Sequence, residues 1–316
     1  MKLLVLGAGA VGGYFGGRLL EAGVDVTFLV RPGRREQLKR NGLRIESELG
    51  SLQCPATTLL GEEVRPEYDF VLLTCKAYDL QSAVDALAPT MSSDCTVVPL
   101  MNGIAHFDYL DERLGPGHVI GGTCHIYVST GRDGVIRHTG RLQRLIFGER
   151  DRSTSTRTRA FADMLSNTKI DWELSGDIQQ HLWEKLVFLS SLAATTCLFR
   201  ANVGEIVSAP GARDMIERVL RSTIEIATRE GHPPRPAAIE FARNGLTNPA
   251  GTSTASMLHD IETGRPVESD HIIGWMLDKA RQHGSDDTIL ALAYTHLKAY
   301  EARRLAGRLP EPSSQV

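Results

Sequence analysis

The stretch Leu3-Leu-Val-Leu-Gly7-Ala-Gly9-Ala-Val-Gly12 decides the fold of the first half of the chain. Its first four residues are apolar without alternation, which is typical of a strand buried on both faces of a sheet. The glycines predict a tight turn at Gly7, room for a pyrophosphate against the backbone at Gly9, and close packing of the next helix at Gly12. Because the turn lies between a predicted strand and a predicted helix, we expect a dinucleotide site rather than a flexible glycine-rich loop. The residues expected to bind the dinucleotide are Gly7, Ala8, Gly9, Ala10, Val11 and Gly12.

Outward from this motif, short β-rich runs alternate with helical segments, which predicts a parallel sheet. Further strands are expected at 24–30, 69–74 and 96–100, and the stretch 119–147 should add an antiparallel finish to the sheet. After Trp172 the pattern becomes almost wholly helical. The helices expected there are 177–198, 211–230, 235–243, 253–262, 269–283 and 286–306.

The predicted fold class is therefore an α/β N-terminal Rossmann-type doubly wound domain plus an all-α C-terminal domain. We expect a coenzyme-binding domain at residues 1–170, a helical substrate and dimerisation domain at 171–309, and a disordered tail at 310–316. The apolar helices could pack within one chain or across a homodimer, and the sequence leaves both arrangements open.

The composition argues against several classes of protein. Because 35 Lys and Arg residues stand against 38 Asp and Glu, the net charge is -3, and a nucleic-acid partner is not expected. The five cysteines are scattered and never form a CxxC pair, which indicates reduced thiols and a cytoplasmic protein. No apolar stretch approaches the roughly 18 residues that cross a bilayer, so no membrane partner is expected. The histidines lack HxxxH and HxxEH spacings, and no metal is expected.

The choice of coenzyme is normally determined at the end of the second strand, where an Asp or Glu would bind the 2′-hydroxyl of NAD. This chain has Val30-Arg31-Pro32-Gly33-Arg34-Arg35 there instead. A guanidinium can pair with a 2′-phosphate and stack on the adenine, which favours NADPH and makes Arg31 the candidate contact. The alternative is a solvated basic loop.

Two polar residues are expected at the carboxyl ends of central strands, where open α/β sheets bind their ligands. Lys76 follows the strand at 69–74, and Asn102 follows the strand at 96–100. Each has an ordinary alternative, because a lone lysine is usually a surface residue and Asn-Gly is a common turn pair.

Lys185 is the candidate acid of the helical half. On the helix at 177–198 it has His181, Phe188 and Leu189 as neighbours one turn away, so it either extends to water or lies in a pocket. Hydride addition to a ketone creates an alkoxide that needs a proton donor, which a lysine in this place could supply.

Ser256 and Glu268 flank a segment in which one helix ends at Gly264 and another begins. The ordinary explanation of Glu268 is an acid in the first turn of a helix, favoured by the helix dipole.

Taken together, the motifs resemble the ketopantoate reductase (2-dehydropantoate 2-reductase) family over nearly the whole chain. The matching elements, in family order, are the glycine motif, Cys75-Lys76-Ala77-Tyr78, Asn102-Gly103, Trp183-x-Lys185-Leu186, Ser256-Met257-Leu258-x-Asp260, Glu268 and His283-Gly284. The resemblance implies a Rossmann domain joined to a helical domain, with NADPH and a 2-oxo acid bound in the cleft between them. The roles that it implies are a general acid at Lys185, a substrate-hydroxyl contact at Glu268, a cleft asparagine serving substrate and coenzyme at Asn102, a substrate-binding serine at Ser256, a coenzyme-side lysine at Lys76 and a 2′-phosphate arginine at Arg31.

The chain departs from the family at four positions where asparagine is usual. They are Leu189, Ala193, Val203 and Ser253; Asn202 lies next to one of them. In the family these positions shape the hydrogen-bonding wall that recognises the substrate, and a site that loses such partners loses discrimination.

The sequence therefore predicts an NADPH-dependent reduction of a 2-oxo acid, with 2-dehydropantoate reduced to pantoate in pantothenate biosynthesis. The alternative substrate is a branched or more apolar 2-oxo acid. Two other classes are a 3-hydroxy-acid or sugar-acid dehydrogenase, which Leu189 disfavours, and a non-enzymatic NADP(H)-sensing protein, which the joint presence of Lys185 and Glu268 disfavours.

Overall fold

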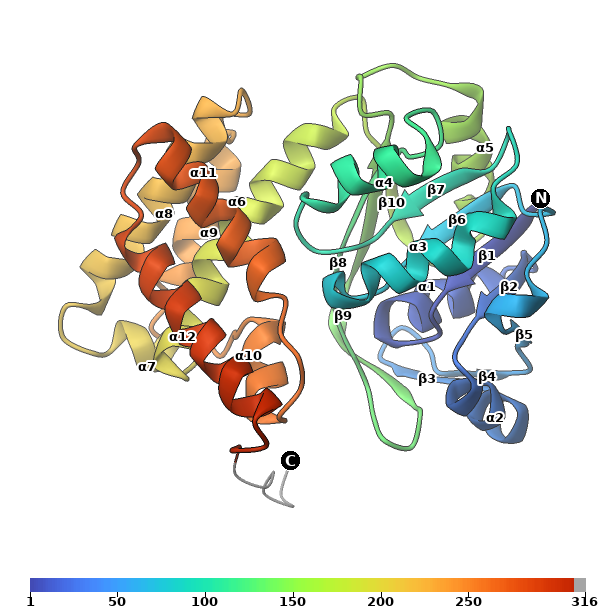
Figure 1. Ribbon diagram of the computed structural model, residues 1–316, viewed down its shortest axis with the longest axis horizontal. Coiled ribbons are helices and arrows are strands. Elements are labelled where there is room, and N and C mark those ends of the chain that lie inside the picture. Colours follow the sequence, from blue (N-terminus) through green and yellow to red (C-terminus); the bar gives the residue numbers. More distant parts are fainter. Residues whose placement is uncertain (310–316) are drawn as a thin grey trace. The chain divides into compact units, whose positions relative to one another are not determined.

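The computed structural model describes residues 1–309, which form two compact units (Figure 1). The first unit comprises Met1–Asn102 and His106–His181, and the second comprises Gly103–Ala105 and the chain from Leu182 onward. The tail expected at 310–316 lies outside the described residues.

The first unit continues past the expected boundary at residue 170. Its last strand, β10 (Asp171–Leu174), pairs in parallel with β9 (Ile136–Gly148), so that the unit ends inside the first turn of the next helix. The other elements of this unit are β1 (Lys2–Leu6), α1 (Ala10–Glu21), β2 (Asp25–Leu29), α2 (Pro32–Asn41), β3 (Leu43–Ser47), β4 (Leu52–Cys54), β5 (Thr57–Leu59), η1 (Gly61–Glu63), β6 (Phe70–Leu73), η2 (Ala77–Asp79), α3 (Leu80–Leu87), η3 (Ala88–Thr90), β7 (Thr96–Pro99), α4 (His106–Leu114), β8 (Gly121–Thr130) and α5 (Thr156–Leu165).

A five-stranded parallel sheet forms the centre of the first unit, with the strand order β5-β2-β1-β6-β7 (Figure 1). The chain starts in the middle at β1, winds to one edge, and then returns to wind to the other. This is the order of a doubly wound fold and confirms the predicted class. The apolar run that opens the sequence becomes the central strand, and Leu3, Leu4 and Val5 are fully buried in it.

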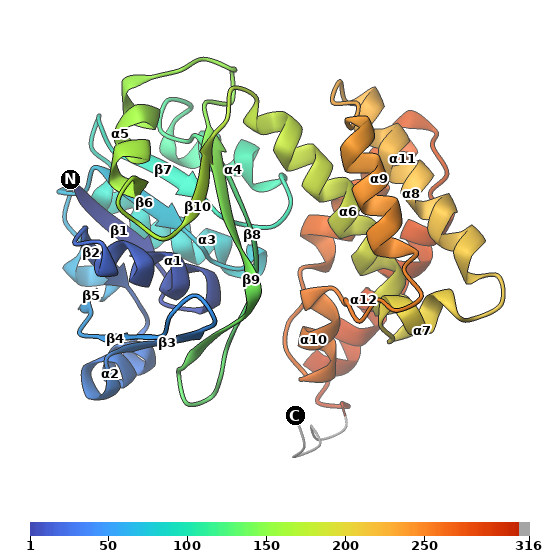
Figure 2. The same ribbon diagram turned by 180° about the vertical axis from the view of Figure 1, so that it is seen from behind.

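A second sheet forms the other layer of this unit, with the order β10-β9-β3-β4 and with β8 paired to β9. Strands β8 and β9 are antiparallel, as expected, and Figure 2 shows them as a long pair. The expectation that they finish the first sheet was wrong, because β9 finds its other neighbours in β3 and β10. Only an isolated bridge between Val97 and Val119 joins this part of the chain to the parallel sheet.

Helix α1 can pack closely against both sheets because it has one glycine facing each of them. A Cβ on Gly16 would lie 2.6 Å from the ring of Phe28 on β2, and one on Gly17 would lie 2.5 Å from Ile45 on β3. Side chains are therefore excluded from two faces of the helix, which lie about 100° apart because the two glycines are consecutive. The sequence predicts this close packing only at Gly12.

All the regular elements in the described part of the second unit are helices, which loops connect (Figure 2). Its elements are α6 (Ile178–Phe199), which begins in the first unit, α7 (Val203–Val207), α8 (Ala212–Arg229), α9 (Pro236–Leu246), α10 (Ser256–Glu262), the π-helical turn η4 (Asp270–Gly274), α11 (Trp275–His283) and α12 (Thr288–Leu305). Five of the six expected helices are confirmed, and the one expected at 269–283 is divided into the π-helical turn η4 and helix α11. The short α7 was missed, although its capping box of Asn202 and Glu205 is a signal that the sequence contains.

Helix α6 corrects the expectation that no segment is long and apolar enough to cross a bilayer. Within residues 1–309 it is the one helix that is long and apolar enough to do so. Most of its apolar part is buried in the fold. The hydroxyl groups of Ser190, Ser191, Thr195 and Thr196 are buried and donate to carbonyl groups one turn earlier, which removes their need for water.

The five cysteines are free thiols. Burial raises the pKa of Cys95 to about 11 and that of Cys197 to about 12. These two side chains therefore stay protonated at neutral pH and are poor nucleophiles.

Candidate functional site

The glycine turn lies between β1 and α1. Gly7 has a φ of +96°, a left-handed conformation that favours glycine, and its N–H donates to the carbonyl of Leu29 at 2.9 Å. A Cβ on Gly12 would collide with the Gly7 carbonyl and with Thr74 Oγ1, whereas nothing lies within 4 Å of a Cβ on Gly9. No side chain caps the start of α1, so its first N–H groups can bind an anion. The turn therefore fits a pyrophosphate.

The three arginines after β2 have different surroundings. Arg34 donates to the carbonyl of Ala8 at 2.9 Å and so ties the start of α2 to the glycine turn. Arg35 pairs with a carboxylate of η1 at 2.9 Å. The side chain of Arg31 is 75% exposed and pairs with Asp79 at 2.7 Å. The three arginines therefore do not form a uniformly solvated basic loop. Of the three, Arg31 is the most accessible to a ligand.

Lys76 and Asn102 follow neighbouring strands, β6 and β7, and both are half-buried. Because these strands are parallel to β1, the two residues belong to the edge of the sheet that carries the glycine turn. Ligands bind at this edge in doubly wound folds.

Gly103 is more than a surface turn residue. It has a φ of +78°, it is buried, and a Cβ on it would lie 2.9 Å from the ring of His271 on η4. The next residue, Ile104, packs against the apolar core of the second unit. The Asn102-Gly103 pair is therefore fixed by tertiary packing, which holds the backbone next to Asn102 in place.

Lys185 lies on α6 and is half-buried. Contacts of its two preceding neighbours fix the rotation of the helix. Trp183 is 4% exposed and its ring stacks on His232 with centroids 5.5 Å apart. Glu184 accepts hydrogen bonds from Arg235 at the start of α9, from the backbone N–H at 2.9 Å and from the guanidinium at 2.8 and 2.5 Å. The stretch of α6 that carries Lys185 is therefore held in place by the contacts of Trp183 and Glu184.

Glu268 and Ser256 lie in the same unit in different environments. Glu268 is 5% exposed, which the ordinary explanation of a solvated acid at a helix start does not account for, because carboxylates are rarely buried without a partner. Ser256 is exposed at the first position of α10.

The segment after Glu268 is a π-helical turn, which side chains of α12 hold in place. Asp270 accepts a hydrogen bond from Tyr294 at 2.6 Å and one from Lys298 at 2.9 Å. The ring of Tyr294 also leaves no room for a Cβ on Gly274, which it would meet at 2.9 Å. Such turns recur at functional sites. The sequence predicts only a regular helix here.

The four positions that depart from the family differ in their surroundings. Ala193 and Val203 are buried in the apolar core, Leu189 packs against it, and Ser253 is exposed and accepts the N–H of Val203 on its carbonyl at 3.1 Å. The side-chain oxygen of Asn202 caps α7 by accepting the N–H of Glu205 at 2.9 Å. This amide oxygen is therefore already used, and it does not replace an asparagine at position 203.

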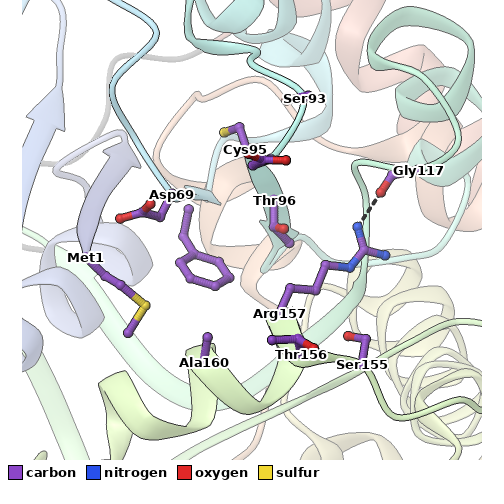
Figure 3. Close-up of a pocket in the computed structure, with 12 residues that line it drawn as sticks. Met1, Asp69, Ser93, Cys95, Thr96, Gly117, Ser155, Thr156, Arg157 and Ala160 are labelled. Carbon is purple, nitrogen blue, oxygen red and sulfur yellow. Dashed lines mark hydrogen bonds between the residues drawn. The ribbon is translucent and has the colours of Figure 1, made fainter.

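A separate hollow lies at the opposite edge of the parallel sheet (Figure 3). It is lined by the first residues of β6 and β7, Phe70 and Thr96, and by the start of α5, where Arg157 donates to the carbonyl of Gly117. Arg157 also pairs with Glu149 at 2.7 Å. The hollow lies at the amino ends of the strands, so it is not the place where this fold binds a dinucleotide.

No metal centre is evident in the described part of the chain. Within residues 1–309, no group of three or more His, Cys, Asp and Glu side chains could hold an ion.

A doubly wound sheet with an open glycine turn, joined to a helical unit, defines a two-domain, dinucleotide-binding class of protein. The chain belongs to the ketopantoate reductase family within that class. Residues 3–152 match the family model described as Ketopantoate reductase PanE/ApbA, and residues 177–301 match the model of its C-terminal part. The protein is thus an oxidoreductase that acts on a keto or hydroxy group, and the family and fold imply a nicotinamide coenzyme.

Individual relatives agree with this assignment. The uncharacterized oxidoreductase YkpB of Bacillus subtilis (strain 168) is 34% identical over 304 residues, which cover 96% of this chain and 100% of the relative. The crystal structure of 2-dehydropantoate 2-reductase from Geobacter metallireducens GS-15 matches with a TM-score of 0.86 at 25% identity, covering 95% and 99% of the two chains. D-mandelate dehydrogenase, solved with NADH and anilino(oxo)acetate, shares the fold with a TM-score of 0.86 at 21% identity, covering 96% and 100%.

Proposed function

We propose that the protein reduces a 2-oxo acid to the 2-hydroxy acid with NADPH, and that 2-dehydropantoate is the substrate and pantoate the product, as in pantothenate biosynthesis. The observation that carries this proposal is the burial of Glu268, 5% exposed, in the helical unit that also holds Lys185. A carboxylate can accept several hydrogen bonds, so Glu268 can bind the distal hydroxyl of 2-dehydropantoate in addition to its partners within the protein.

The residues divide the chemistry among them. A bound reduced nicotinamide would supply the hydride for the keto carbon. The keto oxygen then gains negative charge, and we assign its proton to the ammonium group of Lys185. Asn102 and Ser256 are assigned to orient the carbonyl and the carboxylate, which lowers the entropic part of the barrier. Glu268 is assigned to the distal hydroxyl.

Arg31 supports NADPH as the coenzyme. D-mandelate dehydrogenase has the same fold and was solved with NADH, so the fold alone does not choose between the two coenzymes. The residue after β2 supports NADPH, because an acidic residue there binds a 2′-hydroxyl whereas a guanidinium pairs with a 2′-phosphate. We assign Lys76, from the adjacent strand end, to the same side of the coenzyme.

A second candidate substrate is a branched or more apolar 2-oxo acid. The packing of Leu189, Ala193 and Val203 in or against the apolar core supports it, because these side chains offer no hydrogen bond to a hydroxylated substrate.

The test is NADPH oxidation with a panel of 2-oxo acids that contains 2-dehydropantoate and its deoxy analogue 3,3-dimethyl-2-oxobutanoate. We expect the highest kcat/KM for 2-dehydropantoate. A higher value for the deoxy analogue would support the second candidate. NADPH binding without oxidation by any 2-oxo acid would contradict the enzymatic proposal and favour a sensing protein.

Replacing Leu189 with asparagine should move specificity toward the hydroxylated substrate. Leu189 is one turn after Lys185 on α6, so an amide there could bond to a substrate that Lys185 protonates. We expect the ratio of kcat/KM for 2-dehydropantoate over its deoxy analogue to rise at least about tenfold in Leu189→Asn. Leu189→Met, which keeps the volume and adds no amide, is the matched control and should leave the ratio nearly unchanged. An equal ratio in both variants would show that position 189 does not contact the distal hydroxyl.

We further propose a cytoplasmic enzyme whose partner is its small-molecule substrate, with no nucleic-acid or membrane partner. A homodimer stays a prediction, which the mass measured by light scattering tests.

A further inference from the structure

The ion pair between Arg31 and Asp79 spans the strand that carries the glycine turn. Arg31 follows β2 and Asp79 follows β6, and these strands flank β1 on either side. Both flanking strands end level with β1, because Leu6 pairs with Leu29 on one side and with Leu73 on the other. The two side chains meet at 2.7 Å, at the carboxyl edge of the sheet where the coenzyme is expected.

The carboxylate of Asp79 does not cap the helix that follows it. Asp79 is the residue before the first turn of α3, a position where aspartate normally accepts an N–H of its own helix. Here the side chain makes no such capping bond and binds Arg31 instead. Asp79 is the last residue of η2 and its backbone is already helical, so its carboxylate is not in the usual capping position.

The guanidinium that Asp79 binds is also the accessible one. Arg34 is held by the Ala8 carbonyl and Arg35 by Glu63, whereas the Arg31 side chain is 75% exposed. An anion that approaches this edge therefore meets a guanidinium of Arg31 that already binds the carboxylate of Asp79.

We propose that Asp79 is a specificity-determining residue, which competes with the 2′-phosphate of NADPH for the Arg31 guanidinium and so limits the preference for NADPH over NADH. The inference rests on the proposed role of Arg31 in coenzyme binding. A 2′-phosphate that binds Arg31 must displace the Asp79 carboxylate or lie beside it. Two negative charges on the same guanidinium repel each other. The 2′-hydroxyl of NADH is uncharged and does not take part in this competition.

The test measures the dissociation constants of NADPH and NADH for the complete protein at fixed ionic strength. Asp79 makes no capping bond to α3, so Asp79→Asn removes the charge and keeps the size of the side chain without the loss of a helix cap. We expect Asp79→Asn to bind NADPH about three- to tenfold more tightly, the size of effect that a partly exposed ion pair allows. The constant for NADH should change by less than about twofold, since that coenzyme lacks the competing charge.

Two controls separate this competition from a general effect of charge. Asp85→Asn removes a carboxylate from the same helix, where it pairs with Arg113 at 2.6 Å, and it should leave both constants nearly unchanged. In an Arg31→Ala background, Asp79→Asn should not change the dissociation constant of NADPH further, because the guanidinium for which the two anions compete is absent.

Three results overturn the inference: NADPH binding unchanged in Asp79→Asn, equal tightening of NADPH and NADH, or the same gain in Asp79→Asn with and without Arg31. If the wild-type protein binds neither dinucleotide, the proposed function fails together with it. If the wild-type protein binds NADPH but the variant does not differ, only the inference fails.

Discussion

Lys185→Ala is expected to lower kcat/KM for the 2-oxo acid by about 10²- to 10⁴-fold, the contribution typical of a positioned general acid. The truncation removes the group that we assign to the proton of the keto oxygen. Lys185 lies in the second unit and the glycine turn in the first, so the dissociation constant of NADPH should stay near its wild-type value. Steady-state kinetics together with a fluorescence titration of NADPH measures both quantities.

Lys279 provides the matched control for the loss of a lysine. It lies in the same unit, its side chain is 24% exposed, and it pairs with Glu230 at 3.0 Å. Lys279→Ala should retain most of the turnover. If Lys185→Ala also keeps more than about a tenth of the wild-type rate, Lys185 is not the acid, because a tenfold loss is below the usual range for general acid catalysis.

Two alanine substitutions in the glycine turn should separate folding from coenzyme binding. A methyl on Gly12 would overlap the backbone carbonyl of Gly7, which cannot rotate away, and we expect Gly12→Ala to destabilise the first unit by about 2–4 kcal/mol. A methyl on Gly9 meets no protein atom within 4 Å, and the backbone there is extended, so Gly9→Ala should unfold at nearly the wild-type temperature. It should nevertheless weaken NADPH binding by at least about tenfold, because the methyl occupies the space that a pyrophosphate needs.

Thermal unfolding without coenzyme and NADPH titration of the folded variants measure the two effects. The contrast between the variants is the informative result. A Gly9→Ala protein that binds NADPH like the wild type would place the pyrophosphate elsewhere. A Gly12→Ala protein of unchanged stability would show that the turn can move to accept a side chain.

The local elements of this protein could be predicted from its sequence. A run of apolar residues followed by Gly7-x-Gly9-x-x-Gly12 has few alternatives, because only a buried strand, a turn with positive φ and a closely packed helix satisfy it. The helices of the second unit could be located for a similar reason, since their apolar periodicity and their terminal glycines are local signals.

The environment of single polar residues could not be predicted in this way. Arg31, Arg34 and Arg35 share one basic stretch of sequence, but one is exposed, one supports the glycine turn and one pairs with η1. Asp79 lies 48 positions after Arg31 in the sequence, and only the structure pairs the two. Glu268 has the context of an exposed acid and is buried.

The sequence by itself determined the central strands of the parallel sheet, most helices of the second unit, the doubly wound class and the candidate dinucleotide turn, because these depend on periodicity and on backbone preferences that act over a few residues. Only the tertiary structure decided that β8 and β9 leave the parallel sheet and that Gly103 packs on His271. It also decided which carboxylate binds which guanidinium. Such pairings join residues tens of positions apart, and burial and charge partners arise only when distant segments pack together.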